Sequence, residues 1–394
     1  MYTRVTKHFR NVLVCLMALL MPLATWAQEV STDTLSVEDE DFVRVSLCIA
    51  SPGRIMYSAL GHAFLRMECP THQLDYVFSY ESEDVSQRLL AYLSGNLKMG
   101  MRRVNTDEYM QFYRTSGRSV MAYPLNLPLD MKRELWRVLD ERVHTDQSVP
   151  CDFIQRGCAK ICLICIQQSL NGAEMHVASW PEHLLNTTRR GIVYNGLKDS
   201  PWCRFFFMTF SGYDDVDNPS PQDKILLPTD LLSMLQKADI DGRPVIKDAP
   251  TELVAASPKD QASSFSDWFT PIVLACILLG LALVNLRLRW QSLNLLLLGL
   301  QTLVGLLLLY MVTCSKLPAM QWTWLLIPFN PLSAILWKWR KPAYPILAVI
   351  TTIWCLAMAL WPNPMADWAH ILMALAVAVT LWGLAKNTSI LNKQ

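Results

Sequence analysis

Five apolar segments fill the last third of the chain, and they restrict its possible folds more than any other feature. They are Pro271–Asn285, Leu293–Val312, Trp322–Trp337, Ala343–Trp361 and Ala366–Leu384. A helix needs about 20 apolar residues to cross a bilayer. The second, fourth and fifth segments meet this length, and the first does if it begins near Phe265 or Trp268. The third is short and holds Pro328, Asn330 and Pro331, so we expect a kinked or partly re-entrant segment. The sequence therefore predicts an all-α bundle of about five transmembrane helices.

The charges between these segments predict their orientation. Basic residues follow the first, third and fifth segments: Arg287, Arg289, Lys338, Arg340, Lys341, Lys386 and Lys393. The two other loops hold only Lys316 and Asp367. Cytoplasmic loops carry the excess of Lys and Arg, so the start of the first segment is expected on the outer side of the membrane.

The N-terminus has the features of an export signal. Three basic residues lie within the first ten positions, an apolar run follows from Asn11 to Leu23, and Thr25-Trp26-Ala27 offers a cleavage site. An uncleaved N-terminal anchor is the alternative. With a cleaved signal peptide or with an anchor, the residues that follow are exported, in agreement with the orientation of the apolar segments.

These signals divide the chain into four parts. Residues 1–27 form a signal peptide, residues 28–248 an exported domain, and residues 267–394 a transmembrane domain. Residues 249–266 between the last two are rich in Pro, Ser and Ala, which is typical of a linker.

The exported domain mixes strand and helix patterns. Strands are expected at Val43–Ile49, His62–Met67, Tyr76–Tyr80 and Ser119–Leu127. Helices are expected at Val85–Ser94, Leu129–Val143 and Cys158–Leu170. The fold class is therefore α+β, followed by the transmembrane bundle.

Composition narrows the function classes only slightly. The net charge is +1 and the exported part has no basic stripe, which argues against nucleic acid as a partner. Seven cysteines lie in the exported domain, and an odd number leaves at least one free thiol or one intermolecular bond. The sequence does not decide whether Cys151 is paired.

His62 and Cys158 have settings that suit catalysis. His62 follows Gly61 and opens an apolar strand, and Cys158 follows Gly157 and opens an apolar helix. A thiol at a helix N-terminus has a lowered pKa, and the free N–H groups of the first turn can hold an oxyanion. This arrangement suits a nucleophile with its general base, although two such residues far apart in sequence are easily paired by chance.

The other candidates have simpler explanations. Cys158, Cys162 and Cys165 share one face of the predicted helix, and the apolar residues between them favour a buried stripe over a metal site. His72, His144, His176 and His183 lie in turns, at a helix end or in polar stretches, as surface residues do. We therefore expect neither a metal nor a cofactor.

Three short motifs resemble those of the Lnb N-terminal periplasmic domain family. The first is Tyr57-Ser58-Ala59-Leu60-Gly61-His62-Ala63-Phe64-Leu65-Arg66, after Ala50-Ser51-Pro52-Gly53. The second is Asp75-Tyr76-Val77-Phe78-Ser79-Tyr80, and the third is Asp152-Phe153-Ile154 leading to Gly157-Cys158-Ala159-Lys160. The membrane block also resembles the family's C-terminal domain. Gly157 stands where many members have Asn, so any oxyanion donors here would be backbone groups.

The resemblance implies a papain-like, circularly permuted thiol fold, similar to those of NlpC-type peptidases and lecithin:retinol acyltransferase. It implies a lipoprotein N-acyltransferase of the bacterial inner membrane. His62 would activate Cys158. We expect Asp75 to orient His62, the alternative being that Asp75 is a surface residue of its strand. The thiolate would take an acyl chain from a phospholipid and pass it to the terminal amine of a diacylated lipoprotein.

Three other functions stay open. A cysteine peptidase or cell-wall amidase would use the same two residues with water as the acceptor, but would need only a tether. A membrane receptor or assembly factor would use His62 and Cys158 structurally. A transporter ranks last, because the apolar segments hold few ionisable residues.

Overall fold

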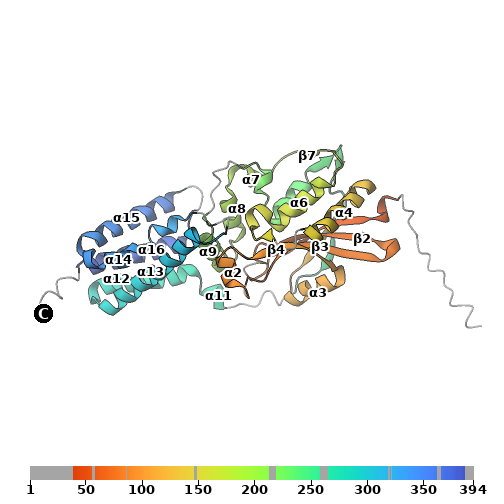
Figure 1. Ribbon diagram of the computed structural model, residues 1–394. Helices are drawn as coiled ribbons and strands as arrows, with labels where there is room; N and C mark the ends of the chain where they lie inside the picture. The colour runs from red at the N-terminus through yellow and green to blue at the C-terminus, as the bar shows by residue number, and fades with distance from the viewer. Residues whose placement is uncertain are drawn as a thin grey trace, which may run out of the picture.

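The computed structural model describes residues 39–55, 58–85, 87–145, 149–212, 219–257, 265–317, 320, 322–361 and 365–386. The predicted signal peptide, Tyr57 of the first motif and residues 258–264 of the predicted linker lie outside these residues. The described chain forms a sheet-containing part and a helical bundle placed end to end (Figure 1).

An antiparallel sheet forms the centre of the exported part. In the described residues it has seven strands in the order β10-β5-β1-β2-β3-β4-β6. Their bounds are β1 (Arg44–Ala50), β2 (His62–Cys69), β3 (Leu74–Ser82), β4 (Lys98–Asn105), β5 (Val120–Pro124), β6 (Val149–Pro150) and β10 (Thr251–Val254). The four predicted strands are confirmed, and the fold class is α+β.

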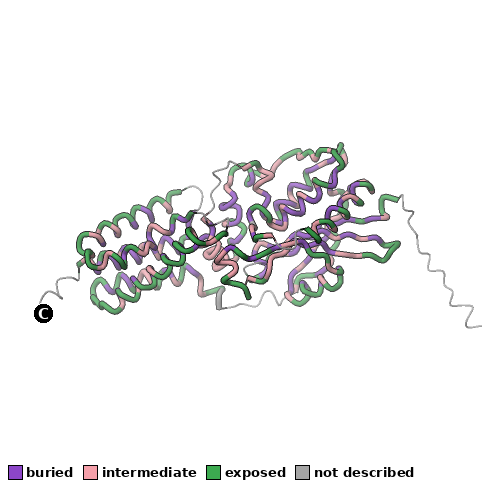
Figure 2. The backbone as a smooth tube through the Cα atoms, viewed as in Figure 1, coloured by how far each residue is buried: buried purple, intermediate pink, exposed green. Residues whose placement is uncertain are grey.

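Successive side chains of each strand point to opposite faces of the sheet, and each face carries its own layer of apolar side chains. On one face, residues such as Leu65 and Phe78 pack under α4 (Leu129–Thr145) and α6 (Cys158–Gln168). On the other face, Phe64 and Val77 pack under α3 (Thr106–Ser116). Because both faces are covered, the central strands are almost wholly buried (purple in Figure 2).

Shorter elements complete the exported part. A second sheet contains β7 (Met175–Val177), β8 (Ala238–Ile240) and β9 (Arg243–Pro244). The short helices are α2 (Leu89–Leu93), α5 (Phe153–Arg156), α7 (Glu182–Asn186), α8 (Arg189–Gly196), α9 (Pro201–Phe210) and α10 (Pro228–Leu235), with single turns η1 (Glu40–Phe42), η3 (Pro70–His72) and η4 (Gln222–Lys224).

The boundary between the exported part and the predicted linker is wrong. Thr251–Val254 form β10 and pair with β5, so the exported fold runs past residue 248. The composition of residues 249–266 predicted a linker because β10 is an edge strand and exposes its polar residues Thr251 and Glu252.

Four helices in the described residues are long and apolar enough to cross a membrane. They are α12 (Pro271–Leu288), after the short α11 (Phe265–Trp268), then α13 (Gln291–Thr313), α15 (Arg340–Leu360) and α16 (Trp368–Lys386). Their outward faces carry exposed apolar side chains, including Leu283, Leu303 and Ile353. The outer parts of the bundle are accordingly green in Figure 2. Such faces suit lipid and not water.

The third apolar segment, for which we expected a kinked or partly re-entrant chain, forms no separate membrane span, and its end joins the fourth segment in one candidate span, Leu332–Leu360. Trp322–Trp337 contains only η7 (Trp324–Leu326), α14 (Leu332–Ile335) and the start of η8 (Leu336–Trp339), although α14 and η8 run into α15. Its irregular backbone lies against α13: a Cβ on Gly305 would come within 1.9 Å of the Phe329 carbonyl oxygen. The Gln301 amide donates to the Pro328 carbonyl and to Ser333.

This irregular segment returns the chain to the far end of the bundle. The residues after α13 and after α15 both contact the exported part, through Lys316 with Ser94 and Asp367 with Arg204. A 21-residue helix is about 32 Å long, so α15 must begin at the opposite end. Arg340, where α15 begins, therefore shares the far end with Lys386, as the orientation predicted from charge requires.

Candidate active site

His62 is positioned by a tight backbone entry into β2. Gly61 has φ +80°, and a Cβ there would come within 2.8 Å of the Ala50 carbonyl oxygen. Only glycine adopts this conformation readily, so it can turn the chain directly into the strand that His62 opens.

Cys158 is the first residue of α6, as predicted. Gly157 precedes it in an extended conformation and provides no capping side chain. The first backbone N–H groups of the helix have no intrahelical acceptors, so they are available to a negative charge near the sulfur. Helix α6 packs on β2 and β3, which brings its first turn to the start of β2.

The structure brings His62 and Cys158 together as a hydrogen-bonded pair, each partly buried. Burial alone raises the pKa of the Cys158 thiol, but the charge and hydrogen bond of His62 and the backbone groups of Ala63 and Ala159 lower it further than burial raises it. Burial likewise lowers the pKa of His62, and Cys158 and Glu81 raise it above its usual value. Both shifts favour a thiolate beside an imidazolium.

The other ring nitrogen of His62 begins a chain of hydrogen bonds. His62 Nε2 lies 2.8 Å from Ser79 Oγ, and Ser79 Oγ lies 2.8 Å from the hydroxyl of Tyr109. The Tyr109 hydroxyl donates to Glu81 Oε1 at 2.5 Å. Burial, with Tyr113 and Glu81 nearby, raises the pKa of Tyr109, so its proton stays in place for this bond.

The Glu81 carboxylate can only accept a hydrogen bond, so it determines which group donates in each hydrogen bond from His62 to Glu81. Since Tyr109 donates to Glu81, its oxygen is left to accept from Ser79, and the Ser79 oxygen to accept from His62. His62 Nε2 is then a donor, which leaves Nδ1 to face Cys158. We name Ser79, Tyr109 and Glu81 the relay.

Asp75, expected to orient His62, lies elsewhere on β3. It pairs with Glu68 in the strand register, six residues along β2 from His62, which is about 20 Å at 3.3 Å per residue. Its carboxylate instead accepts two hydrogen bonds from Arg66 and one from Thr106. The ring of His62 is held by Ser79, a residue that was not predicted from the sequence.

The other cysteines of α6 and the histidine His183 have structural positions in the exported domain. Cys162 and Cys165 are buried in the main core, which confirms the stripe on α6. All ten cysteines in the described residues are free thiols, Cys151 included. His183 hydrogen-bonds the buried Asp230 at 2.8 Å.

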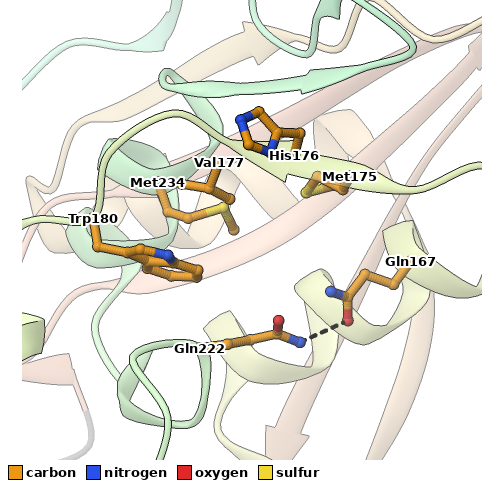
Figure 3. Close-up of a pocket in the computed structure, with 7 residues that line it drawn as sticks. All are labelled: Gln167, Met175, His176, Val177, Trp180, Gln222 and Met234. Carbon is orange, nitrogen blue, oxygen red and sulfur yellow. Dashed lines mark hydrogen bonds between the residues drawn. The ribbon is translucent and has the colours of Figure 1, made fainter.

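A separate pocket of about 260 Å³ lies toward the other end of α6 (Figure 3). It is lined by Gln167, Met175, His176, Val177, Trp180, Gln222 and Met234. The side chains of Gln222 and Gln167 are hydrogen-bonded across it, as the dashed line in Figure 3 marks. Gln167 is nine residues after Cys158, about 14 Å along the helix, so this pocket is distinct from the His62–Cys158 pair.

The site lies at the end of the exported part that meets the bundle. The loop that leads to His62 holds Arg54, which forms an ion pair of 2.6 Å with Asp267 in α11, just before α12. On the Cys158 side, Ile154 of α5 packs in a cluster with Leu197 and Phe207, and Phe207 belongs to α9, the helix that contacts α12. The segments that carry His62 and Cys158 are therefore both connected to the start of the helical bundle.

Comparison with known families agrees with the resemblance seen in the sequence. Residues 31–182 match the model of the Lnb N-terminal periplasmic domain, a range that includes His62, the relay and Cys158. No curated protein and no solved structure gave a match. Residues 31–182 therefore belong to the Lnb N-terminal periplasmic domain family, and the chain is a membrane protein that carries this periplasmic domain ahead of four candidate membrane helices.

Proposed function

We propose that this protein is a lipoprotein N-acyltransferase of the bacterial inner membrane, with Cys158 as nucleophile and His62 as acid and base. The single observation that carries the proposal is the His62–Cys158 pair at the membrane-facing end of the periplasmic domain. A nucleophile in that position is suited to substrates that stay in the membrane.

The first step forms an acyl thioester. The Cys158 thiolate attacks the ester carbonyl carbon of a phospholipid, and the N–H groups at the start of α6 are placed to stabilise the oxyanion. The carbon–oxygen bond then breaks, and imidazolium His62 protonates the departing alkoxide. A lysophospholipid leaves, with His62 neutral and the acyl chain on Cys158.

The second step transfers the chain to nitrogen. The neutral amine of the diacylglyceryl-cysteine attacks the thioester carbonyl, His62 takes a proton from the nitrogen, and the carbon–sulfur bond breaks. The thiolate and imidazolium are restored, so the cycle closes without a cofactor. Donor and acceptor need not be bound together, which suits two lipid substrates that use one site in turn.

The relay supports this use of His62. A donor chain from Nε2 to Glu81 holds the ring with Nδ1 toward sulfur and favours the imidazolium. We propose Ser79, Tyr109 and Glu81 as positioning residues in place of Asp75.

The intermediate itself provides the test. Full-length protein is incubated with vesicles of phosphatidylethanolamine that contain a labelled acyl chain, quenched in acid, and analysed by mass spectrometry. We expect a hydroxylamine-sensitive acyl group on Cys158, absent in Cys158→Ala and at least about 100-fold slower to form in His62→Ala. A wild-type protein that never acquires the label would contradict the proposal.

The same assay separates the alternatives. A peptidase or amidase would cleave a peptide amide and show no gain in turnover from a lipoprotein amine. A receptor would form no thioester, and Cys158→Ala would keep its biological activity.

A further inference from the structure

Four large apolar side chains are exposed where the periplasmic domain meets the bundle. Ile55 is 53% exposed, Leu89 54%, Leu90 82% and Trp268 66%. They come from the loop before His62, from α2 and from α11, three segments far apart in sequence. We name them the apolar rim.

Helix α2 is held at the outer end of α13. Tyr92 packs against both the periplasmic core and the bundle core, and Leu93 packs against the bundle core. The Ser94 carbonyl accepts a hydrogen bond from the backbone of Lys316, three residues past the end of α13. A Cβ on Gly95 would come within 2.3 Å of the Leu317 backbone nitrogen, so glycine permits this close approach.

The loop before His62 is held at the outer end of α12. Arg54 and Asp267 are paired at 2.6 Å, and Asp267 lies four residues before Pro271, where α12 begins. Ile55 is the next residue after Arg54, and Trp268 the next after Asp267. The rim thus stands level with the outer ends of two membrane helices.

We propose that the apolar rim inserts into the outer leaflet of the membrane that the bundle spans. The rim contacts lipid, because it continues the lipid-facing surface of α12 and α13 at the depth where tryptophan rings favour the interface. Four large apolar side chains gathered at one level are unfavourable in water and favourable in this layer.

The rim also flanks the site. The loop with Ile55 ends at His62, and β3, with Ser79 and Glu81, leads to α2. A lipid chain that lies along the rim therefore has a short path to Cys158 without crossing water. This last step rests on the proposed function, whereas insertion of the rim does not.

Photocrosslinking in a bilayer tests insertion. A benzophenone amino acid replaces Leu90 in the full-length chain, reconstituted in vesicles of phosphatidylethanolamine and phosphatidylglycerol. The control is Phe112 on α3, 46% exposed and on the part of the domain away from the bundle (Figure 1). We expect lipid adducts at position 90 at least about fivefold above position 112. Equal yields at the two positions would overturn the proposal.

A charged substitution in the rim tests whether the rim leads phospholipid to Cys158. Leu90→Glu should slow thioester formation from vesicle phospholipid about tenfold, and leave the rate with a short-chain phospholipid dissolved below its micelle concentration unchanged. An equal loss with both donors, or no loss with either, would contradict the path along the rim. If the wild type forms no thioester, the proposed function fails, while the crosslinking result still decides insertion.

Discussion

A neutral serine, and not a carboxylate, contacts the imidazole of His62 at 2.8 Å. The negative charge lies two hydrogen bonds further on, at Glu81, behind the buried hydroxyl of Tyr109. Glu81 therefore favours the imidazolium through this chain and not through a direct ion pair. The relay predicts a pH effect that a purely structural network would not produce.

Glu81→Gln should narrow the active pH range from its alkaline side. Glu81 raises the pKa of His62, so its neutralisation lowers that pKa, and the imidazolium loses its proton at a lower pH. We expect the alkaline limb of kcat/KM to move down by about 1 pH unit. Glu83→Gln, two residues further along the chain and paired with exposed Arg88, is the matched control and should leave the profile in place. Superimposed profiles for wild type and Glu81→Gln would exclude the relay.

Asp75→Asn should behave in the opposite way. The change weakens the contacts with Arg66 and Thr106 and costs about 1 kcal/mol of unfolding free energy, since the Asp75 side chain is 37% exposed. Its pH profile should match that of the wild type, because Asp75 lies far along β2 from His62. Chemical denaturation and the pH dependence of kcat/KM together check both parts, and a shifted profile would restore Asp75 as the orienting group.

Sequence reasoning found two of the three parts of this site. His62 and Cys158 could be predicted because Gly61 and Gly157 mark a tight turn and a helix start beside them. Asp75 was expected to orient His62, whereas Ser79, four residues later on the same face of β3, makes the contact. The choice depends on the register of β3 against β2, which no local pattern of residues reveals.

At the level of elements, the irregular third segment depends on a close approach to α13. Gly305→Ala should destabilise the protein by about 2 kcal/mol, because the added methyl would clash with the Phe329 carbonyl. Gly299→Ala on the same helix meets nothing within 4 Å, so it should be neutral or stabilising by up to about 1 kcal/mol. Thermal unfolding in detergent micelles measures both. Equal effects of the two changes would mean that the segment is not packed on α13.

The elements that were hardest to predict are those that depend on partners. A broken helix could be predicted from Pro328, Asn330 and Pro331. How its backbone is accommodated depends on contacts with Gln301 and Gly305, which only the structure shows. Thr251–Val254 is only four residues long, too short for a clear alternating pattern, and it forms a strand by pairing with β5. Long apolar helices, in contrast, could be predicted from hydropathy alone.

At the scale of the whole molecule, a buried ion pair joins the periplasmic domain to the bundle. Arg204 of α9 contacts Asp367, before α16, at 2.8 Å, and the Asp367 side chain is 2% exposed. Arg190 of α8 adds a hydrogen bond to the Met365 carbonyl, and Thr209 bonds to His370. These contacts fix how the site faces the membrane.

Asp367→Asn should therefore loosen the two parts. It leaves Arg204 buried without its counter-charge and should cost about 3 kcal/mol. We expect a lower melting temperature and faster proteolysis between the domains. Glu134→Gln, which breaks an exposed pair with Arg137, is the control and should leave the melting temperature unchanged. An equally small effect of both changes would show that the domains are held by apolar contacts alone.

The central claim is that Cys158 transfers acyl chains to lipoproteins. Its most direct test is mass spectrometry of lipoprotein N-termini from cells in which this protein is the only N-acylating enzyme. With wild type we expect triacylated N-termini, and with Cys158→Ala, at equal protein level in the membrane, diacylated N-termini that have a free amine. Lipoproteins that remain triacylated in the Cys158→Ala cells would contradict the account.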